Sequence, residues 1–341
     1  MVAQIDGAYI KARPTKLFSR LISYGLFEGR PLTTKGQWIN PIVFTLFRIA
    51  KRLQPSKSVK KPIFIIGTGR SGTTILGVVL SMHRDIGFLN EPKALWHSAY
   101  GGEDLIGSYS REFARYQLGA EDVTPQIKQA MHRMFGWYLV ATGARRVADK
   151  YPELIFRVPF VREIFPDAKF IFLVRNGWDT CHSIEHWSKR LGSQHGSEIH
   201  NWWGVDNRKW KLLVEQLVKN EPGLAAHISE IAGLTRHTDM AAVEWIITMR
   251  EGLRLRQQYP DIVHTVVYED LSTHTDKTLT TLREFCELPP DPVFDNYARQ
   301  TLQTVREKQP FDLHPAIRPE FDAVMRELGY VNNFSVSRHI L

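Results

Sequence analysis

Residues 62–76, PIFIIGTGRSGTTIL, constrain the fold more than any other stretch of this chain. The segment begins as a continuous apolar run, passes through a turn rich in Gly, Ser and Thr, and ends in a pattern typical of a helix start. When a buried strand leads directly into a helix, the backbone N–H groups of the turn and of the first helical residues converge on one point. The segment therefore predicts a strand–loop–helix unit that binds an anion, with Arg70 adding positive charge within the loop.

This loop is similar to a nucleotide-binding P-loop but differs from it at one position. The spacing from Gly67 to Gly72 fits the first part of that motif, whereas Thr73 stands where a nucleotide triphosphatase requires lysine. Ser71, Gly72, Thr73 and Thr74 can therefore hold a phosphate without the lysine that bridges β- and γ-phosphates. Two alternatives stay open: a P-loop-type nucleotide kinase or NTPase, and a glycine-rich turn without a ligand, because short glycine motifs recur by chance.

The chain continues as an alternation of strands and helices. Apolar runs predict strands at residues 62–67 and 169–174, a further strand is expected at 262–267, and 146–149 is a short candidate strand. Helical patterns cover 72–82, 153–165 with an interruption at Pro159, 177–189 and 319–328. Buried strands separated by helices predict an α/β fold of three layers, with a central, mainly parallel sheet flanked by helices. Ligands of such sheets bind beyond the carboxyl ends of the strands.

A second motif lies at the end of one of these strands. In residues 172–183, FLVRNGWDTCHS, Arg175 ends the apolar run and Ser183 follows eight residues later, on the predicted helix. A guanidinium held at a strand end makes charge-assisted bonds to phosphate, and a hydroxyl two turns along the helix adds a neutral donor. Singly, Arg175 also fits a capping ion pair and Ser183 a surface serine.

Together the two motifs resemble those of sulfotransferases, which transfer a sulfuryl group from 3′-phosphoadenosine 5′-phosphosulfate (PAPS) to an acceptor and release 3′-phosphoadenosine 5′-phosphate (PAP). The pattern is most similar to the tyrosylprotein-sulfotransferase-like branch and the bacterial sulfotransferases that share it. The resemblance implies a P-loop-like fold, with residues 70–74 binding the 5′-phosphosulfate, Arg175 and Ser183 binding the 3′-phosphate, and no metal. It covers residues 60–185 well and 240–290 loosely.

The resemblance also implies catalytic residues. Glu91 lies 21 residues after Arg70, where the branch has its catalytic base. Lys150, followed by Tyr151 and a proline, precedes Arg175 by 25 residues, as the lysine of the branch does. Arg70, Lys150 and the loop amides would then stabilise charge on the leaving oxygen. From the residues alone, Glu91 also fits a solvated turn before a proline, and Lys150 an exposed turn lysine.

Other positions carry weaker signals. Where the branch has a further arginine four residues after its serine, this chain has Trp187, and Lys189 or Arg190 are candidate replacements. His97 is a second candidate base, with a packing histidine as the plainer interpretation. Trp245, on a predicted helix ahead of the strand at 262–267, is a candidate to contact adenine.

The expected function is therefore sulfuryl transfer to a hydroxyl or amine of a carbohydrate, lipid or small metabolite. The region that would bind an acceptor differs from the branch, so peptide tyrosine is not implied as the acceptor. The alternatives are a P-loop-type kinase or NTPase, and a catalytically idle nucleotide-binding protein of the same fold.

Composition narrows the setting in which the protein acts. The net charge of +8 and pI of about 9.4 suit an anionic nucleotide, an acidic acceptor or an anionic membrane. No nucleic-acid-binding motif accompanies this charge. Cys181 and Cys286 form no C-x-x-C pair, so a disulfide framework or structural zinc is not expected. Without an apolar signal region in residues 1–14, the expected location is cytoplasmic.

The chain divides into an N-terminal arm, residues 1–58, and a sulfotransferase-like domain, residues 59–341. Apolar residues with interspersed Lys and Arg at 17–53 predict either an amphipathic element on an anionic membrane or a helical arm packed on the domain. Residues 191–238 interrupt the alternation and predict a helical acceptor-side insertion. Four tryptophans lie in or beside this insertion: Trp187, Trp202, Trp203 and Trp210. They fit either a stacking surface for an acceptor or the core of the insertion.

Overall fold

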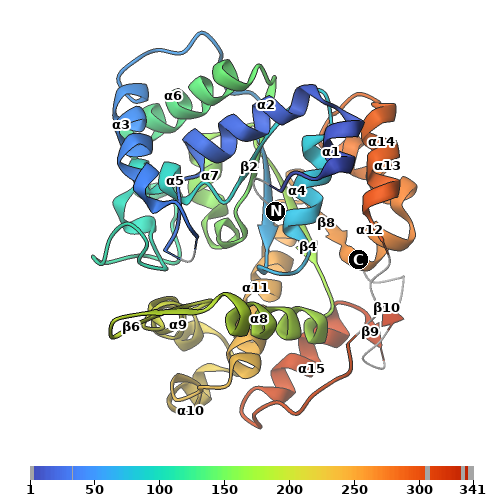
Figure 1. Ribbon diagram of the computed structural model, residues 1–341. Helices are drawn as coiled ribbons and strands as arrows, with labels where there is room; N and C mark the ends of the chain where they lie inside the picture. Colours follow the sequence, from blue (N-terminus) through green and yellow to red (C-terminus); the bar gives the residue numbers. More distant parts are fainter. Residues whose placement is uncertain (1–3, 33, 304–307, 332–334, 337–341) are drawn as a thin grey trace.

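The computed structural model describes residues 4–32, 34–303, 308–331 and 335–336. Its centre is a five-stranded sheet in the order β2-β3-β1-β4-β8 (Figure 1). The strands are β1 (Ile63–Gly67), β2 (Ile86–Asn90), β3 (Arg146–Lys150), β4 (Lys169–Val174) and β8 (Val263–Val267). Every neighbouring pair is parallel, so the predicted α/β fold class is confirmed.

Four of these strands match strands predicted from the sequence, whereas β2 was not predicted. It pairs with β3 from Ile86 opposite Arg146 to Asn90 opposite Lys150 and forms one edge of the sheet. Its five residues include Gly87, and a short segment with an internal glycine carries little strand signal. Pairing with β3, rather than local propensity, therefore makes this segment a strand.

Helices cover both faces of the sheet. Alternate residues of β1 point to opposite sides: Ile63 and Ile65 pack with one buried cluster, Phe64 and Ile66 with the other. The first face is covered by α1 (Gly7–Ala12), α4 (Thr73–Ser81), α13 (Thr275–Phe285) and α14 (Pro292–Thr301). The second is covered by α5 (Lys93–Ala99), α6 (Pro125–Thr142), α7 (Val158–Ile164) and α11 (His237–Gln258). The result is the predicted three-layer arrangement (Figure 1).

The N-terminal arm packs on this domain. Its further elements are α2 (Thr15–Ile22), the π-helical η1 (Ser23–Phe27), the 3₁₀ turn η2 (Gln37–Ile39) and α3 (Asn40–Ala50). The Nζ atom of Lys16 donates to the carbonyl oxygen of Ile86 at 2.6 Å, and Phe27 and Phe47 join the core of the second face. A buried ion pair within the arm, Arg20 with Glu28, contacts the backbone of β2. The arm therefore shares its core with the sheet domain.

The insertion at 191–238 differs from its prediction. It begins with a small antiparallel sheet of β5 (Ser193–His195), β6 (Glu198–Asn201) and β7 (Gly204–Val205). Helical elements follow: α9 (Arg208–Gln216), η6 (Val218–Asn220), η7 (Ala225–His227) and α10 (Ile228–Ala232). Strands of two to four residues are too short to show an alternating pattern, which explains why sequence alone suggested only helix.

Proline also divides one predicted helix. Residues 153–165 form a 3₁₀ segment, η5 (Pro152–Arg157), and then α7, with Pro159 in the first turn of α7. Proline is tolerated there because those N–H groups have no helical partner. The remaining elements are η3 (Gly101–Glu103), η4 (Ala120–Asp122), α8 (Gly177–Leu191), α12 (Tyr268–Thr273), α15 (Arg318–Glu327), β9 (Tyr330–Val331) and β10 (Ser335–Val336). Within the described ranges, no helix combines the length and the apolar character that crossing a membrane requires.

Candidate active site

The loop between β1 and α4 has the backbone of an anion cradle. Gly67 and Gly72 have φ angles of 138° and 102°, and Arg70 between them has a φ of 69°. A Cβ atom on Gly72 would lie 2.3 Å from the ring of Tyr268, so only glycine fits there. A left-handed arginine is unfavourable by itself, and such strain concentrates at ligand sites. Helix α4 begins at Thr73, so its first amide groups face the end of this loop.

A pocket of about 320 Å³, which we call the arginine pocket, brings the two predicted motifs together. It is lined by Gln4, Asp6, Arg70, Gly72, Thr73, Thr74, Ile75, Val78, Arg175, Ser183, Tyr297 and Thr301. The first motif supplies five of these residues and the second motif supplies two. The two motifs are far apart in sequence, but they follow the carboxyl ends of the neighbouring parallel strands β1 and β4. The volume falls in the range of small-molecule sites.

Direct contacts link the two arginines. The Nε atom of Arg70 donates to Ser183 Oγ at 3.2 Å, and Arg175 donates to the carbonyl oxygen of Arg70 at 3.3 Å. The Arg175 guanidinium lies 4.5 Å from the ring centre of Tyr268 and 3.4 Å from a carboxylate oxygen of Asp179. Because Tyr268 also covers Gly72, this one ring holds both motifs in register.

The electrostatics of the arginine pocket favour an anion. Burial, followed by the nearby positive charge of Arg190, lowers the pKa of Arg70. Arg175 lowers it further, and only Glu91 opposes this effect. An arginine stays protonated at neutral pH even so. The lowered pKa therefore reflects burial first and, after it, the repulsion between Arg70 and the neighbouring arginines, which a bound anion would relieve.

Two side chains predicted to bind the nucleotide, those of Ser71 and Trp245, are not part of the lining of the arginine pocket. The Ser71 side chain is buried, and its Oγ donates to the carbonyl oxygen of Thr68 at 2.6 Å, so it stabilises the turn. Trp245 is fully buried against Phe321, and its Nε1 donates to the carbonyl oxygen of Arg175 at 3.1 Å. Its indole thus supports Arg175 from beneath, which corrects the expectation that it faces an adenine.

Glu91 follows β2 on the other side of the loop. Its φ is 51°, and its N–H donates to the carbonyl oxygen of Lys150 at 2.7 Å. The buried Nζ of Lys150 donates to the Glu91 carboxylate, whose side chain is 37% exposed. Burial raises the pKa of Glu91, but Lys150 and Lys93 outweigh burial, and the net pKa lies below the ordinary 4.5. Glu91 is therefore an ionised carboxylate at neutral pH.

Replacing Lys150 with methionine is expected to raise the pKa of Glu91. The substitution removes the largest interaction that favours the carboxylate, while the effect of burial remains. Because the native pKa is depressed, the charged form is present above it and is lost as pH falls through it. An NMR titration of carbon-labelled glutamate, with the resonance assigned from Glu91→Gln, measures the midpoint. An unchanged midpoint in Lys150→Met would contradict this assignment of the charge partner.

Glu91 lines a second pocket of about 90 Å³, which we call the tryptophan pocket. Residues of the arm, the loop, the insertion and segments of the sheet domain complete its lining: Pro31, Leu32, Gly69, Lys93, Ile106, Ser108, Pro152, Glu153, Trp187, His200, Asn201, Trp202, Gly204, Val205 and Lys209. A Cβ atom on Gly69 would lie 2.5 Å from the Trp202 ring, so this ring packs directly on the anion loop. The two pockets therefore lie on either side of Gly69 and Arg70.

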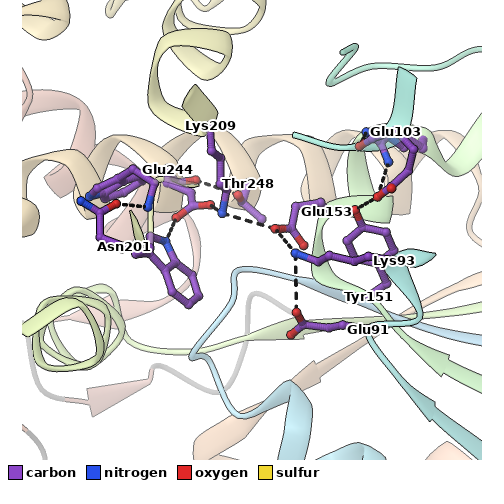
Figure 2. A network of polar contacts seen from close by, with 12 residues as sticks. Glu91, Lys93, Glu103, Tyr151, Glu153, Asn201, Lys209, Glu244 and Thr248 are labelled. Atoms are coloured by element: carbon purple, nitrogen blue, oxygen red, sulfur yellow. Dashed lines mark hydrogen bonds and ion pairs between the residues drawn. The ribbon is translucent and has the colours of Figure 1, made fainter. Parts of the chain in front are cut away.

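A row of alternating charges joins Glu91 to the insertion (Figure 2). Successive contacts are Glu91–Lys93 at 3.6 Å, Lys93–Glu153 at 3.4 Å, Glu153–Lys209 at 3.3 Å and Lys209–Glu244 at 2.5 Å. Glu244 also accepts from Trp202 Nε1 at 2.7 Å. Burial raises the pKa of Glu153, but Lys93 and Lys209 lower it well below its usual range. These ion pairs and hydrogen bonds hold Trp202 and Glu91 in the wall of the tryptophan pocket.

The weaker sequence signals also have clear positions. His97 packs between Phe44 and Tyr109, at ring distances of 6.0 and 5.6 Å, and burial lowers its pKa. It belongs to neither pocket lining, which favours the packing interpretation. Trp187 packs edge-on against Trp202 at 5.3 Å in the tryptophan pocket.

The two candidate replacements for the missing arginine differ in their surroundings. Lys189 is 68% exposed and pairs with Glu185, whereas Arg190 lies close enough to Arg70 to lower its pKa. Arg190 is therefore the better placed of the two. Among the described residues, no group of three or more His, Cys, Asp or Glu side chains is arranged to hold a metal ion.

Some lining residues could not be found by sequence reasoning. Gln4 and Asp6 reach the arginine pocket from the arm, and Tyr297 and Thr301 reach it from α14. The sole local signal is that Tyr297 and Thr301 are four residues apart, hence on one helix face. Nothing in the sequence indicates which cavity that face borders.

Comparison with known proteins agrees with this geometry. Residues 62–218 match the model of the sulfotransferase family. A protein-tyrosine sulfotransferase of Drosophila melanogaster is 30% identical over 125 residues, 36% of this chain and 24% of that protein. The nodulation protein NoeE of Sinorhizobium fredii is 29% identical over 131 residues, 36% of this chain and 30% of that protein. The alignment thus spans about a quarter to a third of the length of these relatives.

Among solved structures, the sulfotransferase domain from the curacin biosynthetic pathway is similar over 83% of this chain and 100% of that chain. The TM-score is 0.48 and the sequence identity 17%. The family predicted from the two arginine motifs is confirmed by the family match, which contains the anion loop, Glu91, Lys150, Arg175 and Ser183. Residues 62–218 of this protein, a little under half of the chain, are thus similar to the sulfotransferase family.

Proposed function

We propose that this protein transfers a sulfuryl group from PAPS to a hydroxyl or amine of an acceptor. The observation that carries the proposal is the meeting of both motifs in the arginine pocket, with the Glu91–Lys150 pair across the same loop. The family match adds support from sequence.

The residues of the arginine pocket fit the nucleotide donor. Arg70, Thr73 and Thr74, with the amides at the start of α4, would hold the 5′-phosphosulfate. Arg175 and Ser183 would hold the 3′-phosphate. Within the described part of the chain, the buried Nε of Arg175 has no hydrogen-bond partner, so a charged donor is available there. A ligand with two separated anionic groups suits this pair of arginines better than one with a single anionic group.

In the proposed reaction, Glu91 accepts the proton of the acceptor hydroxyl as the acceptor oxygen forms its bond to sulfur. The bond between sulfur and the phosphate oxygen breaks, and PAP leaves with that electron pair. Arg70 and the loop amides stabilise the negative charge on the departing oxygen. Lys150, at the end of β3 beside β1, holds Glu91 in its ionised form. The proton therefore ends on Glu91 and the sulfate ester on the acceptor.

The tryptophan pocket would receive the acceptor, because it places Glu91 beside Trp187 and Trp202. Indole rings provide flat apolar surfaces with a polar edge, which suit a sugar ring or the polar end of a lipid. We therefore extend the proposal to an acceptor that is a carbohydrate, a lipid or a small metabolite with a free hydroxyl or amine.

PAP is expected to raise the free energy of unfolding by about 2.7 kcal/mol at 100 times its dissociation constant. AMP, which lacks the 3′-phosphate, should stabilise far less at equal concentration, and so should ATP with Mg²⁺. Thermal unfolding with each nucleotide measures this order. Equal stabilisation by AMP would contradict the proposal that Arg175 and Ser183 bind a 3′-phosphate. Stronger stabilisation by ATP with Mg²⁺ would favour a kinase or NTPase. Transfer of label from PAPS to a panel of acceptors then separates an enzyme from an idle nucleotide-binding protein.

A further inference from the structure

Helix α3 of the N-terminal arm carries an exposed apolar stripe. Trp38, Ile42, Leu46, Ile49 and Leu53 are 76%, 52%, 39%, 50% and 51% exposed. Their spacing of four, four, three and four residues places them along one side of the helix and its flanking turns. A surface helix of a globular protein normally exposes polar residues on the side away from the core. This side of α3 therefore needs a partner that the described chain does not supply.

The opposite side of α3 already serves the core. Val43 and Phe47 are fully buried there, and Phe44 packs against Tyr109 at a ring distance of 5.4 Å. The helix is thus anchored in the domain through one face, and it stands at the outer edge of the molecule (Figure 1). The sequence left two interpretations of the arm open, a helix packed on the domain and an amphipathic element on a surface. In α3, one face is packed on the domain and the other is free for surface contact.

The charge around the stripe indicates the chemistry of the partner. Residues 31–61 contain seven Lys and Arg residues and no Asp or Glu. Arg48 and Arg52 are exposed on α3 or directly after it, next to the apolar residues. An apolar stripe bordered by cations is the pattern of helices that lie in the interface of an anionic membrane. A protein partner would have to offer both an apolar groove and a continuous acidic rim to match it.

We propose that the stripe on α3 docks this protein onto an anionic lipid surface, with Arg48 and Arg52 contacting the headgroups. The 11 residues of α3 would lie in the plane of the interface, because about 20 are needed to span a bilayer. This docking does not depend on the proposed reaction.

Sedimentation of the full chain with vesicles tests the proposal. The protein should bind vesicles of phosphatidylcholine with phosphatidylglycerol, and should bind phosphatidylcholine alone much more weakly. Binding should fall as salt rises from about 0.1 M to 1 M, because the Debye length shrinks from about 10 to 3 Å. Equal binding to both vesicle types, or no binding to either, would overturn the proposal.

Matched variants assign the binding to this face. Ile49→Glu should weaken vesicle binding more than tenfold, whereas Ile199→Glu on β6 should leave it unchanged. The two isoleucines are 50% and 51% exposed, and β6 lies on a different part of the molecule (Figure 1). The double variant Arg48→Glu, Arg52→Glu keeps the apolar stripe. Its affinity for anionic vesicles should also fall at least about tenfold, since each cation near the surface contributes about 1 kcal/mol to binding.

The alternative occupant is a second protein molecule, including another copy of this chain. Size-exclusion chromatography of the native protein and of Ile49→Glu measures self-association. If the native protein forms a dimer that Ile49→Glu dissociates, and vesicles do not bind, the stripe is a protein interface and the lipid proposal is wrong. Equal loss of vesicle binding in Ile49→Glu and Ile199→Glu would equally contradict it, since the effect would then not be specific to α3.

Discussion

Glu91→Gln is expected to lower turnover by 10²–10⁴-fold, the usual contribution of a general base, and to leave PAP binding nearly unchanged. Glutamine keeps the shape of the side chain and can still accept a hydrogen bond from Lys150, but it cannot take the proton of the acceptor. Binding should survive because Glu91 lines the tryptophan pocket, whereas the predicted nucleotide contacts line the arginine pocket. Release of PAP from PAPS in the presence of acceptor measures turnover, and thermal unfolding with PAP measures binding.

The chain offers a close control for this substitution. Glu287 also has a left-handed backbone, with a φ of 54° against 51° for Glu91, and it too pairs with a lysine, Lys61. Its side chain is 47% exposed, against 37% for Glu91, and it belongs to neither pocket lining. Glu287→Gln should therefore retain full turnover. Near-full activity of Glu91→Gln would move the base to another residue, and a large loss in both variants would indicate a structural effect.

Arg175→Ala is expected to weaken PAP binding about 10- to 100-fold while changing AMP binding little. A hydrogen bond to a charged group contributes about 1.5–3 kcal/mol, and the two ligands differ by the phosphate that Arg175 would hold. The loss should appear as a collapse of the preference for PAP over AMP. Isothermal titration with the two nucleotides measures this preference directly.

Arg318 provides the control for Arg175. It likewise pairs with an aspartate four residues later, Asp322 at 2.6 Å, and lies over an aromatic ring, that of Trp178 at 5.4 Å. Arg318 does not line the arginine pocket, so Arg318→Ala should keep the preference for PAP. If Arg175→Ala weakens PAP and AMP equally, Arg175 acts by supporting the pocket, and the 3′-phosphate must bind elsewhere.

The local units of this protein could be predicted from its residues. In residues 62–76 and 172–183, an apolar run passes directly into a glycine- or polar-rich turn and a helix start, and these signals lie within about a dozen neighbouring residues. The parallel sheet followed from repeating such units, because a helix that crosses over between two strands returns the chain in the direction needed for parallel pairing. Arg70 and Arg175 at strand ends were predictable for the same reason.

Which distant segments border these units depends on how the layers of the fold pack together. Gln4 and Asp6 reach the arginine pocket, and Pro31 and Leu32 reach the tryptophan pocket, through packing of the arm on the sheet. Trp245 turned out to support the Arg175 carbonyl because α11 packs beneath β4, not because of its own pattern. Side-chain contacts between segments far apart in the chain depend on how whole layers pack, and local propensity carries no information about them.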